Sequence, residues 1–168
     1  MTFDFSEFKN KKIIVTGSST GIGFETGVEF LNLGANVIFH GNQSINDLEA
    51  RIKSKSQSQN FKIFKSDFTD LSQVDNFMNN AINYLNGLDI LVNNAGTMVG
   101  RYQLETISEK DFLKIFDLNA KSAYFAIKSA CTIFKKQNYG NIINVSTISA
   151  RTGGSAGSSV YAASKAFV

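Results

Sequence analysis

A glycine-rich turn between an apolar run and a helical segment constrains the fold of this chain most strongly. The apolar run at residues 11–16 predicts a buried strand, and Gly17, Gly21 and Gly23 follow it. Residues 24–33 carry apolar or small side chains on one side of a helix. Glycines permit a tight bend and a close backbone approach, and a helix N-terminus offers free N–H groups. The unit predicts a phosphate-binding loop. An ordinary glycine-rich loop is the alternative, because the spacing G-x-x-x-G-x-G differs from the common G-x-G-x-x-G fingerprint.

Strands and helices alternate along the rest of the chain. Further strands are expected at residues 36–40, 61–65, 88–92 and 142–145. Helices are expected at 44–55 with Ser44 as cap, from Thr69 or Asp70, from Ser108 to Gln137, and from Ser159 or Val160, with loops at 97–106 and 147–159. Right-handed crossovers of this length join parallel strands. The pattern predicts an α/β fold, a doubly wound parallel Rossmann-type sheet, in one domain spanning residues 1–168.

Composition and charge exclude several classes of protein. The 168 residues carry a net charge of only +3, and the lysines are scattered, which argues against nucleic-acid binding. No apolar run approaches the length of a membrane span, and residues 1–12 lack the apolar segment of a signal peptide. We therefore expect a cytoplasmic protein without nucleic-acid or membrane partners. The single cysteine excludes an internal disulfide, and no metal site is predicted.

Tyr161 and Lys165 stand four residues apart in the last expected helix, where side chains at this spacing share a face. A neighbouring ammonium favours the phenolate form of a tyrosine, which can then exchange a proton with an alcohol or carbonyl oxygen near neutral pH. An isolated Y-x-x-x-K pattern is common on protein surfaces, so a plain surface pair is the alternative. Here the pair follows a hydroxyl-rich strand end and shares the chain with the glycine turn.

Five motifs together resemble the short-chain dehydrogenase/reductase family, with some likeness to 3-oxoacyl-[acyl-carrier-protein] reductases. They occur in family order and cover most of the chain: Thr16-Gly17-x-x-x-Gly21-Ile22-Gly23, Asn93-Asn94-Ala95-Gly96, Asn119 within Asp117–Ala120, Asn144-Val145-Ser146-Thr147, and Tyr161-Ala162-Ala163-Ser164-Lys165. The resemblance implies NAD(P)-dependent hydride transfer between nicotinamide and a small-molecule carbonyl or alcohol substrate.

The resemblance also implies a role for each matching residue. Cofactor contacts are expected from Gly17, Ser19, Thr20, Gly21, Ile22, Gly23, His40, Asp67, Phe68, Asn93, Ala95, Gly96, Tyr161 and Lys165. Among the catalytic residues, Tyr161 would be the general acid/base and Lys165 would bind the nicotinamide ribose. Asn119 would hold a water in the proton relay, and Thr147 would orient the substrate carbonyl. Two alternatives stay open: Asn119 as a helix kink or cap, and Asp67 as a turn residue.

Two local departures from the family pattern leave questions open. The hydroxyl that matches the family serine belongs to Thr147, one residue further from the tyrosine than usual, so Ser146 and Ser149 are fallback candidates. Residues 40–43, after the second strand, include no acid to repel a 2′-phosphate, which favours NADP mildly over NAD. No arginine or lysine stands there to bind that phosphate either.

The chain is shorter than is usual for the family and lacks the last strands of its fold. The fifth strand is therefore expected to form an exposed sheet edge, and Lys165 to sit in a frayed helix end. The same helix commonly packs against a partner subunit in this family, so a homo-oligomer is expected only if that helix is complete. Two rival hypotheses follow: a catalytically impaired nucleotide-binding remnant, and a fragment of a split gene that needs a complementing piece.

Overall fold

A parallel five-stranded sheet forms the centre of the computed structural model, which describes residues 4–43 and 45–168. Its spatial order is β3-β2-β1-β4-β5. The bounds are β1 (Lys12–Val15), β2 (Asn36–Gly41), β3 (Phe61–Lys65), β4 (Ile90–Asn93) and β5 (Asn141–Asn144). Every neighbouring pair is parallel, with Ile13 opposite Val37 in β2 and Ile90 in β4. The predicted doubly wound α/β sheet is confirmed.

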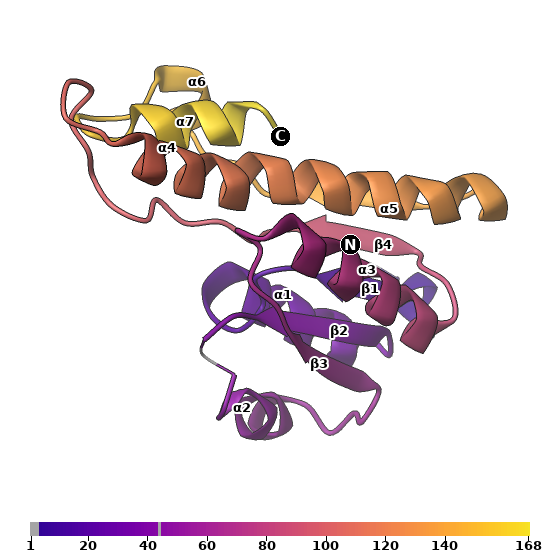
Figure 1. Ribbon diagram of the computed structural model, residues 1–168. Coiled ribbons are helices and arrows are strands. Elements are labelled where there is room, and N and C mark those ends of the chain that lie inside the picture. The colour runs from indigo at the N-terminus through magenta and orange to yellow at the C-terminus, as the bar shows by residue number, and fades with distance from the viewer. Residues whose placement is uncertain (1–3, 44) are drawn as a thin grey trace.

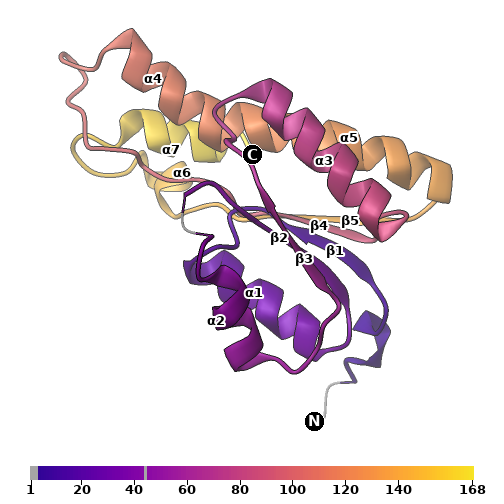
Figure 2. The same ribbon diagram turned by 60° about the horizontal axis from the view of Figure 1, so that its bottom comes forward.

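Helices cover both faces of the sheet (Figures 1 and 2). One face carries α1 (Gly21–Asn32) and α2 (Leu48–Lys55); the other carries α3 (Leu71–Leu85) and α5 (Ser122–Gln137). The remaining helical elements are η1 (Ser6–Phe8), α4 (Glu109–Phe116), the π-helix η2 (Asp117–Lys121), α6 (Ser149–Thr152) and α7 (Ser159–Ala166). Figure 2 shows α7 beside α4, beyond the carboxyl ends of the strands. None of the helices in the described ranges is both long and apolar enough to cross a membrane.

Two apolar clusters, one on each face of the sheet, explain why residues 13–15 of β1 are all apolar. Ile14 in β1 belongs to the cluster beneath α3 and α5, whereas its neighbours Ile13 and Val15 belong to the cluster beneath α1 and α2. Successive side chains of a strand point to opposite faces, so a sheet covered on both sides needs apolar residues at every position. Full burial of each such side chain contributes about 1.5–3 kcal/mol.

Side-chain caps fix the starts of two helices as the sequence predicts. The Asp70 carboxylate accepts a hydrogen bond from the Ser72 N–H at 2.9 Å, before α3. The Ser108 hydroxyl accepts one from the Asp111 N–H at 3.1 Å, before α4. The predicted cap at Ser44 lies outside the described residues, and α2 begins after Asp47.

Two predicted elements are wrong in detail. The helix expected from residue 108 to 137 is interrupted by η2, whose central Asn119 donates from Nδ2 to the Ile115 carbonyl at 2.8 Å. A side chain that bonds the carbonyl four residues back competes with the helical ladder, which favours a π-bulge here. The loop expected at 147–159 contains the short helix α6, which ends where Gly153 adopts φ +80°.

The exposed sheet edge is confirmed. β5 pairs with β4, and no other strand in the described part of the chain pairs with its opposite side. The Ile143 side chain in β5 is 46% exposed. An apolar strand edge of this kind presents unpaired backbone groups to other chains.

Candidate functional site

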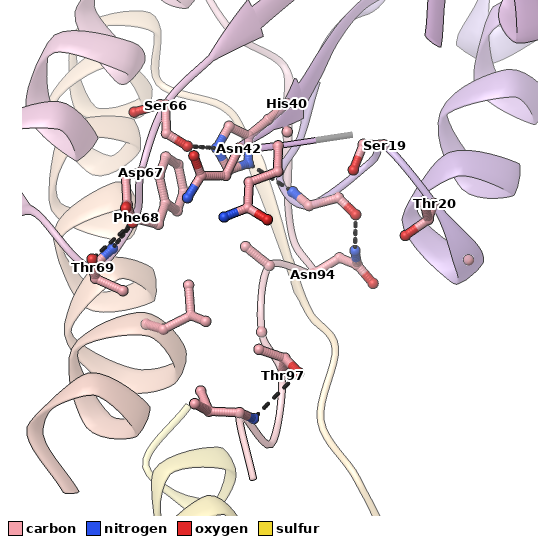
Figure 3. A pocket seen from close by; sticks show the side chains of 18 of the residues that line it. Ser19, Thr20, His40, Asn42, Ser66, Asp67, Phe68, Thr69, Asn94 and Thr97 are labelled. Carbon is pink, nitrogen blue, oxygen red and sulfur yellow. Dashed lines mark hydrogen bonds between the residues drawn. The ribbon is translucent and has the colours of Figure 1, made fainter. Parts of the chain in front are cut away.

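A cavity of about 670 Å³ lies at the carboxyl ends of the strands (Figure 3). Ten of the residues predicted for the site line it: Gly17, Ser19, Thr20, Gly21, Ile22, His40, Asp67, Phe68, Ala95 and Gly96. The sequence prediction missed other lining residues, among them Asn42, Asn94, Thr97, Val99 and Lys114. Ligands of open parallel sheets bind at this edge, so the cavity lies where the topology places a binding site.

The glycine turn needs its glycines for two separate reasons. Gly17 and Gly21 adopt φ +61° and +59°, which side chains disfavour. A Cβ on Gly17 would also lie 2.6 Å from the Ala95 Cα, and a Cβ on Gly23 would lie 2.6 Å from the Gly17 carbonyl oxygen. The turn therefore packs directly on the backbone after β4, with no room for a side chain between them.

Asn94 holds the glycine turn in place from the neighbouring strand end (Figure 3). Its Nδ2 donates to the carbonyl oxygens of Thr16 and Gly17 at 3.0 and 2.9 Å. The Thr16 hydroxyl in turn accepts from the Asn94 and Ala95 N–H groups at 3.1 and 3.0 Å. The Asn-Asn-Ala-Gly motif contains this residue, but the sequence prediction assigned a cofactor contact to Asn93 and none to Asn94.

The N-terminus of α1 lies at the cavity. Thr20 is the N-cap residue, and its hydroxyl makes no capping hydrogen bond within the described chain. The first N–H groups of a helix have no partner inside the helix, and the macrodipole adds partial positive charge there. Such a helix end suits a phosphate group, and Thr20, Gly21 and Ile22 all line the cavity beside it.

His40 lies buried under the turn, with only 3% of its surface exposed. Its Nδ1 accepts from the Gly17 N–H at 2.9 Å, and its Nε2 lies 3.1 Å from the Ser66 carbonyl oxygen. Burial lowers the pKa of His40 to about 4, against the opposing effects of the Ser66 hydrogen bond and the Asp67 charge. His40, expected from the resemblance to contact the cofactor, lines the cavity but is almost entirely buried.

Asp67 stands at the end of β3 as a turn residue that also lines the cavity. One carboxylate oxygen accepts from the Thr69 N–H at 2.9 Å and from the Thr69 hydroxyl at 2.8 Å. Burial acts to raise the pKa of Asp67, but hydrogen bonds from Thr69 and from the Asn42 side chain outweigh it, and the pKa lies below its ordinary value. The carboxylate is therefore charged at neutral pH.

A second group of predicted residues lies in close contact at Gly96, which lines the cavity: Gly96, Asn119 and Lys165. A Cβ on Gly96 would lie 2.5 Å from Asn119 Oδ1 and 3.0 Å from Lys165 Nζ. Asn119 is fully buried; its Oδ1 accepts from the Thr97 N–H and its Nδ2 donates to the Thr97 carbonyl, both at 2.9 Å. The Asn119 side chain thus connects the loop after β4 to η2. This structural role corresponds to the alternative in which Asn119 kinks the helix.

Lys165 is well supported, contrary to the frayed end expected from the sequence. Its side chain is buried, and Nζ donates to the Val145 carbonyl at 2.9 Å. The Ser146 hydroxyl donates to the Lys165 carbonyl at 2.7 Å, so β5 and its following residues anchor α7. Burial lowers the pKa of Lys165. An ammonium has three donors, and the bond to Val145 leaves donor capacity for a ligand.

Three further predicted residues, Tyr161, Thr147 and Asn93, are not among the residues that line the cavity. Tyr161 is half-buried on α7, one turn before Lys165. Thr147 Oγ1 accepts from the Ser149 N–H at 3.3 Å, whereas the Ser146 hydroxyl is engaged with α7. Asn93 is buried outside the cavity lining, and its Nδ2 donates to Asn144 Oδ1 at 3.0 Å.

Metal ions in proteins are bound by clusters of side chains. Across the described residues, no group of three or more histidine, cysteine, aspartate or glutamate side chains is placed to hold a metal ion. The candidate site is built instead from backbone N–H groups, amides, hydroxyls and one buried lysine.

Comparisons with known proteins agree with this geometry. A probable NADP-dependent mannitol dehydrogenase from Yarrowia lipolytica is 32% identical over 142 residues, which are 84% of this chain and 51% of that enzyme. The crystal structure of an NADH-dependent reductase A1-R′ complexed with NAD is similar at a TM-score of 0.88 and 31% identity, covering 98% of this chain and 70% of that one. A short chain dehydrogenase from Burkholderia cenocepacia in complex with NADP is similar at a TM-score of 0.83 and 27% identity, covering 95% of this chain and 64% of that one.

The chain therefore spans about half the length of the mannitol dehydrogenase that it matches. The family model described as short chain dehydrogenase matches residues 11–168, which is nearly the whole sequence. With the parallel sheet, the glycine turn and the Tyr161–Lys165 helix on one framework, the chain belongs to the short-chain dehydrogenase family.

Proposed function

We propose that this chain is the dinucleotide-binding unit of an NAD(P)-dependent oxidoreductase that acts on a small carbonyl or alcohol. The observation that carries the proposal is the cavity bounded by the glycine turn, with the Gly96–Asn119–Lys165 cluster beside it. The names of the relatives, an NADP-dependent dehydrogenase and an NADH-dependent reductase, support the same reaction class. The carbonyl substrate itself stays unspecified.

The described residues fit a dinucleotide at each of its parts. The pyrophosphate would lie over residues 17–23, where a Cβ at Gly17 or Gly23 would collide with backbone and where α1 offers free N–H groups. The adenine would lie near Asp67 at the end of β3. The ammonium of Lys165 would bind the hydroxyls of the nicotinamide ribose.

The protein's own chemistry in this proposal is proton transfer. The Tyr161 hydroxyl would donate its proton to the substrate oxygen as that oxygen becomes an alcohol, and would take it back in the oxidative direction. The hydroxyl of Thr147, with Ser149 as alternative, would donate a hydrogen bond to the same oxygen and stabilise its developing negative charge. When bound, the nicotinamide cofactor supplies or accepts the hydride. The proton must then be replaced from solvent.

The direct test is NADPH and NADH binding, followed by cofactor oxidation with a panel of ketones and aldehydes. Binding together with turnover supports the proposal. Binding without turnover favours the alternative of a catalytically impaired nucleotide-binding remnant. A chain that binds neither dinucleotide contradicts both. Self-association and a cytoplasmic location stay predictions, which light scattering and cell fractionation would test.

A carboxylate introduced at residue 42 should reverse the mild preference for NADP. Asn42 lines the cavity and bonds Asp67, and the end of β2 carries no acid in the wild-type chain. In Asn42→Asp, a second negative charge would repel a 2′-phosphate, so NADPH affinity should fall about tenfold or more while NADH affinity stays within a few fold. Fluorescence titration with both cofactors measures this.

The matched control for that change is Asn42→Ala, which removes the amide without adding charge. It should affect NADPH and NADH equally, because only the bond to Asp67 is lost. Equal effects on both cofactors in Asn42→Asp would place the 2′-phosphate elsewhere in the site.

A methyl group at residue 96 should separate binding from turnover. In Gly96→Ala, the new Cβ would need to displace Asn119 Oδ1 or Lys165 Nζ, at 2.5 and 3.0 Å. Misplacement of a catalytic group by about 1 Å can cost about 100-fold in rate, so kcat should fall by roughly 10- to 100-fold while pyrophosphate contacts at the turn persist. Steady-state kinetics with a parallel cofactor titration checks this, and an unchanged kcat would show that the close packing of Gly96 on Asn119 and Lys165 is not needed for turnover.

A further inference from the structure

His40 joins the ends of three neighbouring strands beneath the cavity. Its ring lies between the Gly17 N–H, at 2.9 Å from Nδ1, and the Ser66 carbonyl oxygen, at 3.1 Å from Nε2 (Figure 3). The ring also stacks on Phe68 at a centroid distance of 3.9 Å and meets the edge of Phe77 at 4.8 Å. One side chain from β2 therefore touches the turn after β1 and the segment after β3.

The two partners of the ring specify one protonation state. The Gly17 N–H can only donate, so Nδ1 must be a bare acceptor; the Ser66 carbonyl can only accept, so Nε2 must carry the hydrogen. A charged imidazolium would direct an Nδ1–H at the Gly17 N–H. The nearby Asp67 carboxylate favours the charged form, but burial outweighs it and lowers the pKa of His40 to about 4.

The main chain of His40 strengthens the same connection. The His40 N–H donates to the Ser18 hydroxyl at 2.8 Å, and the Ser18 N–H donates to the His40 carbonyl at 2.8 Å. The glycine turn is therefore held against β2 by the hydrogen bonds between Ser18 and the His40 main chain, and by the imidazole at Gly17. Because Gly17 has φ +61° and packs on Ala95, a small shift of its N–H changes the path of the whole turn.

We propose that His40 is a positioning residue, which sets the place of the phosphate-binding turn by accepting the Gly17 N–H at Nδ1 while its Nε2–H is anchored on the Ser66 carbonyl. The inference rests on the proposed function, since it concerns the cofactor that the turn would hold. His40 does not touch the reacting atoms and takes no part in proton transfer. Its effect is on the affinity of the dinucleotide.

The tautomer can be read without any cofactor, because His40 is the only histidine in the chain. Protein labelled with ¹⁵N-histidine should show one imidazole at pH 7, with Nε2 protonated and Nδ1 bare. An Nδ1–H tautomer, or a charged ring at that pH, would overturn the proposal. The spectrum reports on the hydrogen bonds of His40 to Gly17 and Ser66 even if the protein binds no cofactor.

Two substitutions then separate positioning from stability. His40→Phe keeps an aromatic ring against Phe68 but loses both ring hydrogen bonds; His40→Asn loses the ring and the Ser66 bond, yet its Oδ1 can still accept from Gly17. We expect His40→Phe to weaken NADPH binding about tenfold or more, and His40→Asn to bind within about threefold of wild type. Both should lower Tm by about 2–10 °C. Binding is measured well below each Tm.

The NADPH affinities of His40→Phe and His40→Asn distinguish a positioning role from a purely structural one. A purely structural role would lower Tm in both variants and leave the affinity of the folded protein unchanged, so wild-type affinity in His40→Phe contradicts the proposal. Equal weakening in His40→Asn and His40→Phe contradicts it as well, because the Gly17 acceptor would then be irrelevant. If wild-type protein binds neither NADPH nor NADH, the proposed function fails, and the positioning role for a cofactor fails with it, whatever the tautomer.

Discussion

Replacement of Tyr161 by phenylalanine should lower kcat for carbonyl reduction by about 10²- to 10⁴-fold, the range that a lost general acid costs. Phenylalanine fills the same half-buried position on α7 but cannot donate a proton. The glycine turn and the Lys165–Val145 hydrogen bond do not involve the Tyr161 hydroxyl, so NADPH affinity should stay within a few fold. Stopped-flow measurement of cofactor oxidation, beside a fluorescence titration, gives both quantities.

Tyr84→Phe is the matched control for this change. Tyr84 lies on α3, and its side chain is largely exposed. Loss of that hydroxyl should leave kcat and the NADPH Kd unchanged. Turnover that survives in Tyr161→Phe would remove Tyr161 from the acid/base role and leave the nucleotide-binding function standing alone.

Replacement of Gly17 by alanine should abolish cofactor binding and destabilise the fold by about 2–4 kcal/mol. Two costs combine at this position. The backbone has φ +61°, and the new Cβ would lie 2.6 Å from the Ala95 Cα. Backbone cannot move aside like a flexible side chain, so the turn must shift away from the strand end after β4 and from the N-terminus of α1. Urea unfolding and NADPH titration measure the two effects.

Gly21→Ala separates the backbone cost from the cost of the Cβ contact, because Gly21 has nearly the same φ as Gly17. Gly21 has φ +59°, but outside its two neighbours and the backbone of its own helix, no described atom lies within 4 Å of the position that a Cβ would take. Its substitution should therefore cost about 1 kcal/mol, the left-handed backbone penalty reduced by the lower entropy of the unfolded chain. Equal losses of stability in Gly17→Ala and Gly21→Ala would show that the contact with Ala95 is unimportant.

Sequence reasoning located half of the residues that line the cavity, because the signals for these residues are local. A glycine turn after an apolar strand, a polar residue after each strand and the parallel topology together place ten predicted residues on one cavity wall. Capping residues such as Asp70 and Ser108 are equally local, since their bonds span two or three residues. Local patterns of this kind are readable without knowing what packs against them.

The details that were wrong or missed depend on distant contacts. Asn119, in the π-bulge, exchanges two hydrogen bonds with Thr97, which lies 22 residues away in sequence. Asn94 reaches 78 residues back to Thr16, and neither partner alone signals the pair. Lys165 is held by its hydrogen bond to the Val145 carbonyl, which lies 20 residues earlier in the sequence. The sequence predicted a frayed helix end instead, because Lys165 lies close to the last residue.

By itself, the sequence determined the parallel α/β architecture, the glycine turn and the family to which the chain belongs, because these depend on periodicity and on motifs that lie within short stretches. Only the tertiary structure decided how the turn is held. His40 could have been a surface residue, a catalyst or a ligand by its chemistry alone. Its place between a fixed donor at Gly17 and a fixed acceptor at Ser66 assigns it one tautomer. A hydrogen bond between strand ends needs both partners at a set distance and angle, and only the folded sheet supplies that geometry.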